Sequence, residues 1–275
     1  MATSINTGTE QLLASQDGGI LTLTLNRPEA RNALSDDLSP ALRAMLAQTA
    51  KDDNIGALII TGAGTAFCAG GDVKGMGGKL EKKTMSTEER IADLQQRQRA
   101  LTGVLATLPQ PTIAALPGPA VGAGLAIALA CDIRIAATSA FLSTGYRRVA
   151  LSGDYGISWL MTRLVGTARA RQLMFTSERI GAHWCERIGL VNQVVPDDYL
   201  QTAAQTMAKS FAEGPRTALR LMKENLNLAI QTDFLSALDH EASQLVASSR
   251  NPDHTEAVRA FIEKRAPKFS QKFYL

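Results

Sequence analysis

Hydrophobic and polar residues alternate in residues 19–28, GILTLTLNRP, where three leucines are separated by two threonines. This period of two predicts a half-buried strand that ends at the proline. Residues 55–64, IGALIITGAG, form an apolar run that ends in glycines, which predicts a strand buried on both faces. Between these strands, residues 38–53 place apolar side chains at helical spacing, and Ser35 is a candidate N-cap for that helix.

Strands and helices continue to alternate up to about residue 200. Residues 111–137 contain a strand, a glycine-rich turn, a helix and a second strand. The helix begins near Gly122, and its small apolar residues on all sides predict that it is buried all round. Residues 187–197 add another strand, after which the pattern is helical only. The sequence therefore predicts an α/β core in residues 1–200 and a C-terminal helical region in residues 201–275.

The composition is that of an ordinary globular protein, with 45% hydrophobic and 20% charged residues. A formal net charge of +3 is too small to indicate a nucleic-acid partner or an anionic membrane. The longest run without a charged or strongly polar residue, residues 113–131, is interrupted by two prolines and a glycine, and what remains is too short to span a bilayer. The N-terminus lacks the pattern of a signal peptide, and the three cysteines lie among apolar residues. These features predict a soluble, cytoplasmic protein with reduced, packed thiols.

Several common active sites are excluded by their motifs. Residues 75–80, GMGGKL, resemble a phosphate-binding loop, but Leu80 stands where a magnesium-binding Ser or Thr is required. No serine lies in a G-x-S-x-G motif, so a nucleophile elbow is not predicted. The three histidines lie far apart in the sequence and lack the spacing of metal ligands. No metal site is predicted.

Asp154 is a carboxylate in an apolar stretch, residues 150–159, ALSGDYGISW. Four of its neighbours are predicted to be core: Leu151, Tyr155, Ile157 and Trp159. Burial of an unpaired carboxylate is costly, so the acid needs either a partner or a chemical role. The structural alternative is an ion pair with Arg147 or Arg148, and the functional one is proton transfer.

Two glycine-rich turns are the other candidates for chemistry. Residues 66–73, AFCAGGDV, follow a predicted buried strand, and residues 116–126, LPGPAVGAGLA, lead a strand into the buried helix. Backbone N–H groups at such turns can converge on an oxygen that gains negative charge. Each turn alone is equally well explained as an ordinary tight turn. Together with Asp154, the two turns indicate a site for stabilising an oxyanion.

These segments resemble the crotonase superfamily, the enoyl-CoA hydratase/isomerase family. The resemblance is carried, in order, by LTLTLNRPEARNAL, TGAGTAFCAGGDV, PGPAVGAGLAIALACDIRIA and RIGLVNQVVPD, and it extends over nearly the whole chain. It implies a spiral of ββα units with a C-terminal helical trimerisation region, and a homotrimer or homohexamer. It also implies an acyl-CoA thioester as substrate, with coenzyme A as part of that substrate and no separate cofactor.

The resemblance also implies roles for individual residues. The oxyanion hole is expected from the backbone N–H groups of Gly71 and Ala123. The remaining expected substrate contacts are Ala30 to adenine, Ala69, Gly70 and Asp72 to pantetheine and the thioester, and Lys264 to a CoA phosphate, from a neighbouring subunit. Asp72 is alternatively a turn residue, and Tyr146 is either a wall of the acyl pocket or ordinary core.

Departures from the family pattern indicate the reaction. Hydratases of the family carry two glutamates, and the matching positions here are Ala126 and Tyr146. Asp154 instead matches the acid that members shifting double bonds use to move protons. Dienoyl-CoA isomerases have an aspartate at this position, and so do isomerases resembling the ring-opening 1,2-epoxyphenylacetyl-CoA isomerase, which also lack the two glutamates. One carboxylate is sufficient for such a shift, because it can remove a proton and return it elsewhere on the acyl chain. An apolar setting would raise the pKa of Asp154 and suit it to both steps.

Three other functions remain open from the sequence. The first is a hydratase in which Asp154 acts alone through a water molecule. The second uses Asp154 as a nucleophile, as in the 4-chlorobenzoyl-CoA dehalogenases of the superfamily. The third is a catalytically silent acyl-CoA-binding protein. The acyl group itself is not predicted, since the far wall of the pocket comes partly from residues 74–89, whose glycines and charges define no shape.

Overall fold

The main sheet is parallel except at one edge. The computed structural model of the chain describes residues 2–72 and 85–274. In this part of the chain the sheet has seven strands, in the spatial order β1 (Thr3–Ile5), β2 (Leu12–Asp17), β3 (Ile20–Leu25), β4 (Ala57–Gly62), β5 (Thr112–Leu116), β7 (Ile133–Ala137) and β10 (Gln193–Val195). β1 pairs antiparallel with β2, and β2 pairs antiparallel with β3. The strands β3, β4, β5, β7 and β10 run parallel to one another and are joined by crossovers that contain helices.

A smaller sheet and the helices complete the fold. The smaller sheet contains β6 (Ala120–Val121), β8 (Phe141–Ser143) and β9 (Ile180–Gly181). The core helices are α1 (Leu38–Thr49), α3 (Thr87–Gln98), α4 (Val104–Thr107), α5 (Ala123–Ala130), α6 (Ile157–Thr176), α7 (Ala182–Arg187) and α8 (Leu200–Ala212). Short turns of helix occur at η1 (Pro28–Ala30), η2 (Arg99–Gly103), η3 (Tyr146–Val149) and η4 (Asp197–Tyr199). The C-terminal helices are α9 (Arg216–Ala229), α10 (Phe234–Ser249) and α11 (Pro252–Ile262).

Both faces of the main sheet are covered by apolar side chains. Leu58 and Ile60 of β4 point into the cluster that contains α1 and α5, whereas Ile59 points into the cluster formed with α8. All six residues of β4 are buried, and the leucines of β3 are buried while its threonines are partly exposed. The predicted strands are therefore confirmed. Every residue of α5 is also buried, as its composition predicts.

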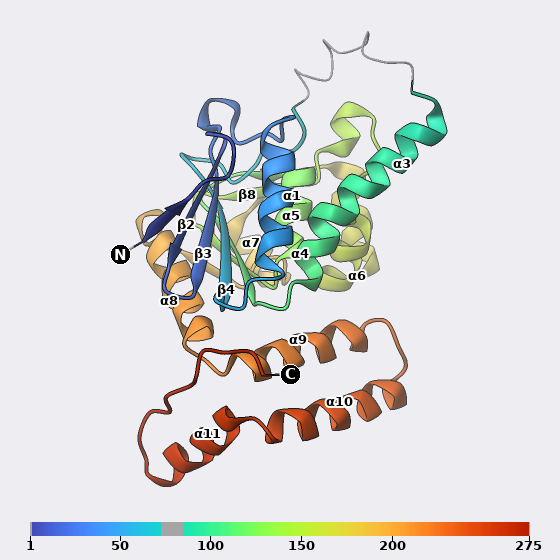
Figure 1. The fold of residues 1–275 in the computed structure, drawn as a ribbon. Coiled ribbons are helices and arrows are strands. Elements are labelled where there is room, and N and C mark those ends of the chain that lie inside the picture. Colours follow the sequence, from blue (N-terminus) through green and yellow to red (C-terminus); the bar gives the residue numbers. More distant parts are fainter. Residues whose placement is uncertain (1, 73–84, 275) are drawn as a thin grey trace.

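The C-terminal helices α9, α10 and α11 form an arm that stands apart from the α/β body (Figure 1). The sequence-based division at residue 200 assigns α8 to the helical region. In the structure α8 packs on β4 and β5, since its alanines complete one of the two core clusters. α8 is therefore part of the body, and the arm begins at α9.

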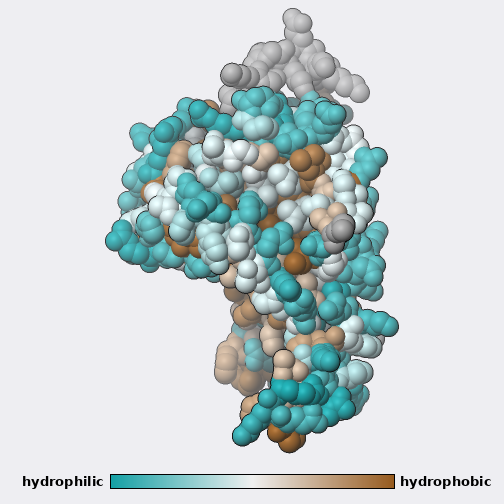
Figure 2. Space-filling view, turned by 90° about the vertical axis from the view of Figure 1, so that its left-hand side faces the viewer, coloured by the Kyte–Doolittle hydropathy of each residue, from teal (hydrophilic) through white to brown (hydrophobic). Residues whose placement is uncertain are grey.

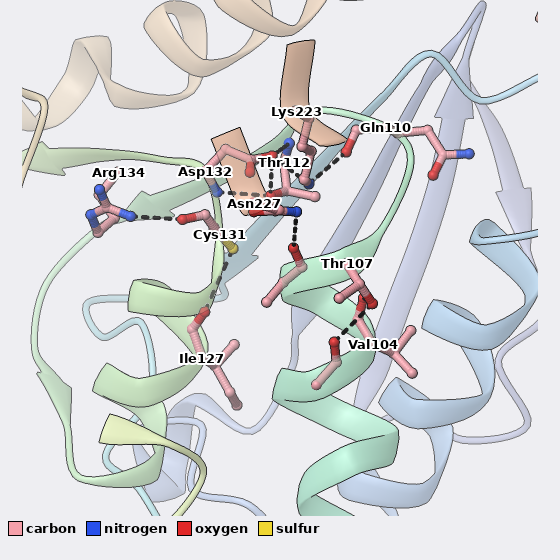
Figure 3. A network of polar contacts seen from close by, with 12 residues as sticks. Val104, Thr107, Gln110, Thr112, Ile127, Cys131, Asp132, Arg134, Lys223 and Asn227 are labelled. Atoms are coloured by element: carbon pink, nitrogen blue, oxygen red, sulfur yellow. Dashed lines mark hydrogen bonds and ion pairs between the residues drawn. The ribbon is translucent and has the colours of Figure 1, made fainter. Parts of the chain in front are cut away.

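A partly buried polar network attaches the arm to the body (Figure 3). Lys223 of α9 donates through Nζ to Oδ2 of Asp132 at 2.7 Å and to the carbonyl of Gln110 at 3.1 Å. Thr112 of β5 also donates to Oδ2 of Asp132, through its N–H and its hydroxyl. Asp132 lies just after α5, so the arm is bonded to the C-terminal end of that helix.

Replacement of Lys223 by methionine is expected to lower the free energy of unfolding by about 2–3 kcal/mol. Lys223 is 8% exposed, and its loss leaves the carbonyl of Gln110 and part of the Asp132 carboxylate without their donor. Urea denaturation would measure the change. The matched control is Lys209→Met, because Lys209 pairs with Glu213 at 3.7 Å on the exposed side of α8 and should change stability little. Equal effects of the two substitutions would contradict this role of the network.

The arm carries a large exposed apolar surface, visible on the lower part of the molecule (Figure 2). Its exposed apolar residues are Met222, Leu226, Ile230, Phe234, Leu235, Leu238, Leu245, Val246, Val258, Phe261 and Ile262. Apolar patches of this kind mark surfaces that contact another molecule. Across residues 2–72 and 85–274, no helix combines the length and apolar composition that a membrane span needs.

Candidate active site

The loop after β4 is shaped by close approach to the turn before α5. Gly70 has φ +93°, and a Cβ there would lie 2.9 Å from the carbonyl oxygen of Val121. The loop is also bonded to the chain before α1, since the N–H of Leu34 donates to the carbonyl of Gly70 at 2.8 Å. A larger residue than glycine would separate the two segments, which explains the glycines of the motif.

The turn into α5 packs on the same loop. Val121 donates its N–H to the carbonyl of Cys68 at 2.9 Å, and Gly122 precedes the helix with φ +56°. A Cβ on Gly124, in the first turn of α5, would lie 2.3 Å from the carbonyl oxygen of Cys68. The helix therefore begins in direct contact with the loop that carries Gly71.

The N–H groups of Gly71 and Ala123 are candidate donors to a ligand. Ala123 is the first residue of α5, where helix N–H groups have no partner within the helix. Within the described chain, neither N–H donates a hydrogen bond to another group. Both residues line the same two cavities. Two convergent amide donors, one of them at a helix N-terminus, can stabilise an oxygen that becomes negatively charged.

Asp154 faces these donors from the loop before α6. The loop has an irregular backbone, with φ +117° at Gly153, +51° at Tyr155 and +77° at Gly156. Asp154 lines both cavities together with Gly71 and Ala123. The structure thus brings the predicted acid and the two predicted amides to one site.

The side chain of Asp154 has one hydrogen-bond partner among the described residues. The hydroxyl of Tyr146 donates to Oδ1 of Asp154 at 2.6 Å. In the same part of the chain, neither Arg147 nor Arg148 forms an ion pair with Asp154, so the structural alternative does not hold. Burial raises the pKa of Asp154, and the hydrogen bond from Tyr146 opposes that rise. Burial and then the charge of Asp154 raise the pKa of Tyr146, which keeps its hydroxyl protonated.

Two cavities meet at Gly71, Ala123 and Asp154. The smaller one, about 150 Å³, is mostly apolar, and its other lining residues are Ala69, Gly70, Val121, Gly122, Thr144, Gly145, Tyr146, Val149 and Leu151. The larger one, about 380 Å³, lies between α1 and α3, and its other lining residues are Leu34, Ser35, Asp36, Ser39, Pro40, Arg43, Asp93, Leu94, Arg97 and Tyr155. A thioester carbonyl placed at the two amides would therefore have space on both sides.

Three of the predicted contact residues lie outside these cavities. Ala30 is on η1, and the adjacent Arg31 accepts through its carbonyl the N–H of Ala69 at 3.0 Å, so η1 lies beside the loop. Asp72 forms an ion pair with Arg27 at 3.2 Å, a partner that neither sequence interpretation included. Lys264 is exposed and follows α11 on the arm, away from the site in this chain.

Part of the sequence reasoning about the neighbours of Asp154 was wrong. Tyr155 and Ile157 are buried as predicted, but Leu151 is 58% exposed and Trp159 is 43% exposed. Leu151 lines the smaller cavity, and Trp159 stacks with Arg163, whose guanidinium lies 3.9 Å from the ring centre. An apolar stretch in the sequence does not predict which of its side chains line a cavity or lie on the surface, as these two do.

The sequence analysis also missed the residues that α1 and α3 contribute to the larger cavity. Ser39 and Arg43 come from α1, and Asp93 and Arg97 come from α3. No motif marks these positions, since they are polar residues on helices far away in the sequence. The part of the expected far wall in residues 74–84, like the GMGGKL segment, lies outside the described residues.

The cysteines and other possible metal ligands do not gather at the site. Cys68, Cys131 and Cys185 are free and buried, and burial raises the pKa of each thiol to about 12. The prediction of packed thiols is therefore confirmed. Over the ranges that the structure describes, no group of three His, Cys, Asp or Glu residues is placed to hold a metal ion.

Comparison with known proteins gives a match over almost the whole chain. Residues 15–272 match the enoyl-CoA hydratase/isomerase family. The 1,2-epoxyphenylacetyl-CoA isomerase of Escherichia coli (strain K12) is 37% identical over 267 residues, which cover 96% of this chain and 99% of that protein. The mitochondrial enoyl-CoA hydratase domain-containing protein 2 of Bos taurus is 36% identical over 262 residues, covering 94% of this chain and 86% of the relative.

Solved structures agree with this result. The crystal structure of enoyl-CoA hydratase from Bacillus anthracis matches with a TM-score of 0.88 and 33% identity, and covers 96% of this chain and 100% of that one. The expected fold, a crotonase-type α/β core with a helical C-terminal region, is therefore confirmed. The chain belongs to the enoyl-CoA hydratase/isomerase family of the crotonase superfamily.

Proposed function

We propose that this acyl-CoA-processing enzyme shifts a double bond in an enoyl-CoA, with Asp154 as the group that moves the proton. The observation that carries the proposal is the position of Asp154, which lines both cavities together with Gly71 and Ala123, the residues whose N–H groups are proposed as oxyanion donors. Burial raises the pKa of Asp154, which makes the carboxylate a better proton acceptor than an exposed aspartate. The Escherichia coli relative is named an isomerase, which is the class of reaction proposed here, and its named substrate is 1,2-epoxyphenylacetyl-CoA.

The proposed mechanism has two proton transfers. Asp154 removes a proton from a carbon conjugated with the thioester, the C–H electrons enter the π system, and the thioester oxygen becomes a dienolate oxyanion. The N–H groups of Gly71 and Ala123 stabilise that oxyanion in a site that excludes much of the solvent. Asp154 then returns the proton to a different carbon, and the double bond is displaced. No water is consumed, and the carboxylate is regenerated.

The residues at the two hydratase positions favour isomerisation over hydration. Ala126 is fully buried within α5, and Tyr146 uses its hydroxyl to bind Asp154. By the resemblance, both positions hold glutamates in hydratases, where they activate water and deliver a proton. Neither residue present here can act as a general base at neutral pH. Among the described residues, Asp154 is the carboxylate that both cavities share.

Incubation of a 3-enoyl-CoA in deuterated water tests the reaction. We expect 2-enoyl-CoA of which a fraction carries deuterium at the carbon that receives the proton, because the proton held by Asp154 exchanges with solvent in part of the turnovers. Mass spectrometry and NMR would detect the label. Comparable conversion of 2-enoyl-CoA to the 3-hydroxy product would instead establish a hydratase. An acyl-aspartate adduct at Asp154 would support nucleophilic catalysis. Binding of thioesters without any turnover would identify an acyl-CoA-binding protein.

We also propose that the arm mediates assembly into a homotrimer or homohexamer. The proposal is supported by the exposed apolar side chains of α9, α10 and α11. Assembly would bring Lys264 of one subunit toward the CoA phosphates bound by another, with coenzyme A serving only as part of the substrate. Light scattering would measure the mass of the assembly. A monomer at micromolar concentration would contradict this part of the proposal.

A further inference from the structure

We propose that Tyr146 is a positioning residue, which binds Oδ1 of Asp154 and leaves Oδ2 as the one oxygen that carries the proton. The proposal rests on the proposed isomerase function and deepens it. The observation is the 2.6 Å hydrogen bond from the Tyr146 hydroxyl to Oδ1, with no second partner for this carboxylate in the described chain. A carboxylate with two equivalent oxygens is thereby converted into a base with one reactive atom.

Tyr146 is buried, and its backbone is held by hydrogen bonds on both sides. Tyr146 is 7% exposed; its N–H donates to the carbonyl of Thr144 at 2.9 Å, and its carbonyl accepts from the N–H of Leu151 at 3.0 Å. The hydroxyl of Thr144 in turn contacts that of Ser177 at 3.0 Å. The ring lies next to the oxyanion turn, since a Cβ built on Gly122 would be 4.0 Å from Cζ of Tyr146. The phenol is thus a fixed point at the site.

The loop that carries Asp154 holds its backbone, since the N–H of Ile157 donates to the Asp154 carbonyl at 3.2 Å, but it does not restrain the carboxylate. Its residues have left-handed or otherwise irregular backbone angles, and regular helix starts only at Ile157. A carboxylate on such a loop can rotate about χ1 and χ2 unless another side chain restrains it. The hydroxyl of Tyr146 supplies this restraint, because a charge-assisted hydrogen bond is short and directional.

The other polar groups around Asp154 have different contacts. Tyr155, the next residue, faces the larger cavity, and its N–H donates to Gln98 at 2.9 Å. Asp93 and Arg97 of α3 form an ion pair with each other at 2.9 Å. Two further charged groups line this cavity: Asp36, which precedes α1, and Arg43 of α1. None of these side chains forms an ion pair or hydrogen bond with Asp154 in the part of the chain that the structure describes.

A single reactive oxygen has a stereochemical consequence. The proton leaves one carbon for Oδ2 of Asp154 and returns from the same Oδ2 to another carbon, so both transfers occur on one face of the planar dienolate. Part of a deuterium label on the donor carbon should therefore reappear on the acceptor carbon. If both oxygens were free, rotation of the carboxyl group would give the label more opportunity to exchange with solvent.

The variant Tyr146→Phe tests the proposal, because it removes the hydroxyl and keeps the buried ring. We expect kcat to fall about 10- to 100-fold with KM almost unchanged, and the fraction of transferred label to decrease. In the wild type, the hydrogen bond from Tyr146 lowers the pKa of Asp154. Its loss should raise that pKa, so the acid limb of the kcat/KM profile, the decrease of kcat/KM at low pH, should move to higher pH. An unchanged acid limb and label transfer, or a loss confined to KM, would overturn the proposal.

Tyr155→Phe is the matched control, since it removes a phenol hydroxyl next to Asp154 that, among the described residues, forms no hydrogen bond with the carboxylate. In Tyr155→Phe, the decrease of kcat/KM at low pH should occur at the same pH as in the wild type. A shift equal to that of Tyr146→Phe would count against a specific role of Tyr146. The acid limb can be followed on whichever thioester the wild-type enzyme converts. Failure of the isomerase function would appear as hydration by the wild type, whereas failure of this inference would leave isomerisation intact and Tyr146→Phe unaltered.

Discussion

Replacement of Asp154 by asparagine is expected to reduce kcat for 3-enoyl-CoA isomerisation roughly 10⁴-fold, while thioester binding stays near the wild-type level. The loss is large because the same carboxylate serves as base in the first step and as acid in the second. Asparagine keeps the size of the side chain and can still accept the hydrogen bond from Tyr146. Single-turnover kinetics and calorimetric titration with a non-reactive acyl-CoA would separate the two effects.

The stability of Asp154→Asn provides a control for folding in this experiment, and the pKa of Asp154 predicts its direction. Because burial raises the pKa in the folded protein, the contribution of Asp154 to stability is present at low pH and is lost as pH rises through the raised value. At neutral pH the uncharged asparagine should therefore unfold at the same or a higher urea concentration than the wild type. Retained activity of Asp154→Asn would show that another group carries the proton.

The same pKa determines the pH dependence of the wild-type enzyme. Asp154 must be ionised to accept the first proton, so kcat/KM should decrease as pH falls through its raised pKa. The decrease should therefore begin at a higher pH than it would for an ordinary exposed aspartate. If Asp154→Glu were highly active and its kcat/KM did not decrease at low pH, Asp154 would not be the base.

The fold was predictable from sequence where burial determines the pattern. The alternation of Leu and Thr in β3 and the unbroken apolar run of β4 identify a half-buried and a fully buried strand. The composition of α5 identifies a helix enclosed on all sides, and all its residues are buried. In each case the spacing of apolar residues is sufficient to predict the element and its buried faces, since hydrophobic burial acts over the whole element.

The candidate site was predictable only in part. The glycine-rich motifs indicate backbone amides because close approach of main chains requires glycine, and the resemblance to the family locates them at Gly71 and Ala123. The bond between Tyr146 and Asp154 had no signal in the sequence, because it crosses an irregular loop between η3 and α6. The contributions of α1 and α3 also depend on tertiary packing alone.

Replacement of Gly124 by alanine is expected to lower kcat/KM about 100-fold or more. A Cβ at this position would lie 2.3 Å from the carbonyl oxygen and 2.6 Å from Cβ of Cys68, so α5 must move away from the loop that carries Gly71. That movement increases the separation of the two amides, and loss of one oxyanion donor reduces rates by about 10²–10³. Overpacking should also cost about 1–3 kcal/mol of stability, which circular dichroism and urea denaturation would measure.

Gly103→Ala is the matched control for this substitution, because Gly103 is also in a helical turn and a Cβ there has room. The nearest atom would be the carbonyl oxygen of Gln98 at 3.7 Å, an ordinary contact. Alanine at this position should preserve activity and raise stability by about 0.5–1 kcal/mol, since it restricts the unfolded chain. If Gly124→Ala retained the wild-type kcat/KM, contact between α5 and the loop after β4 would not be what aligns the two amides, and the oxyanion site would have to be assigned elsewhere.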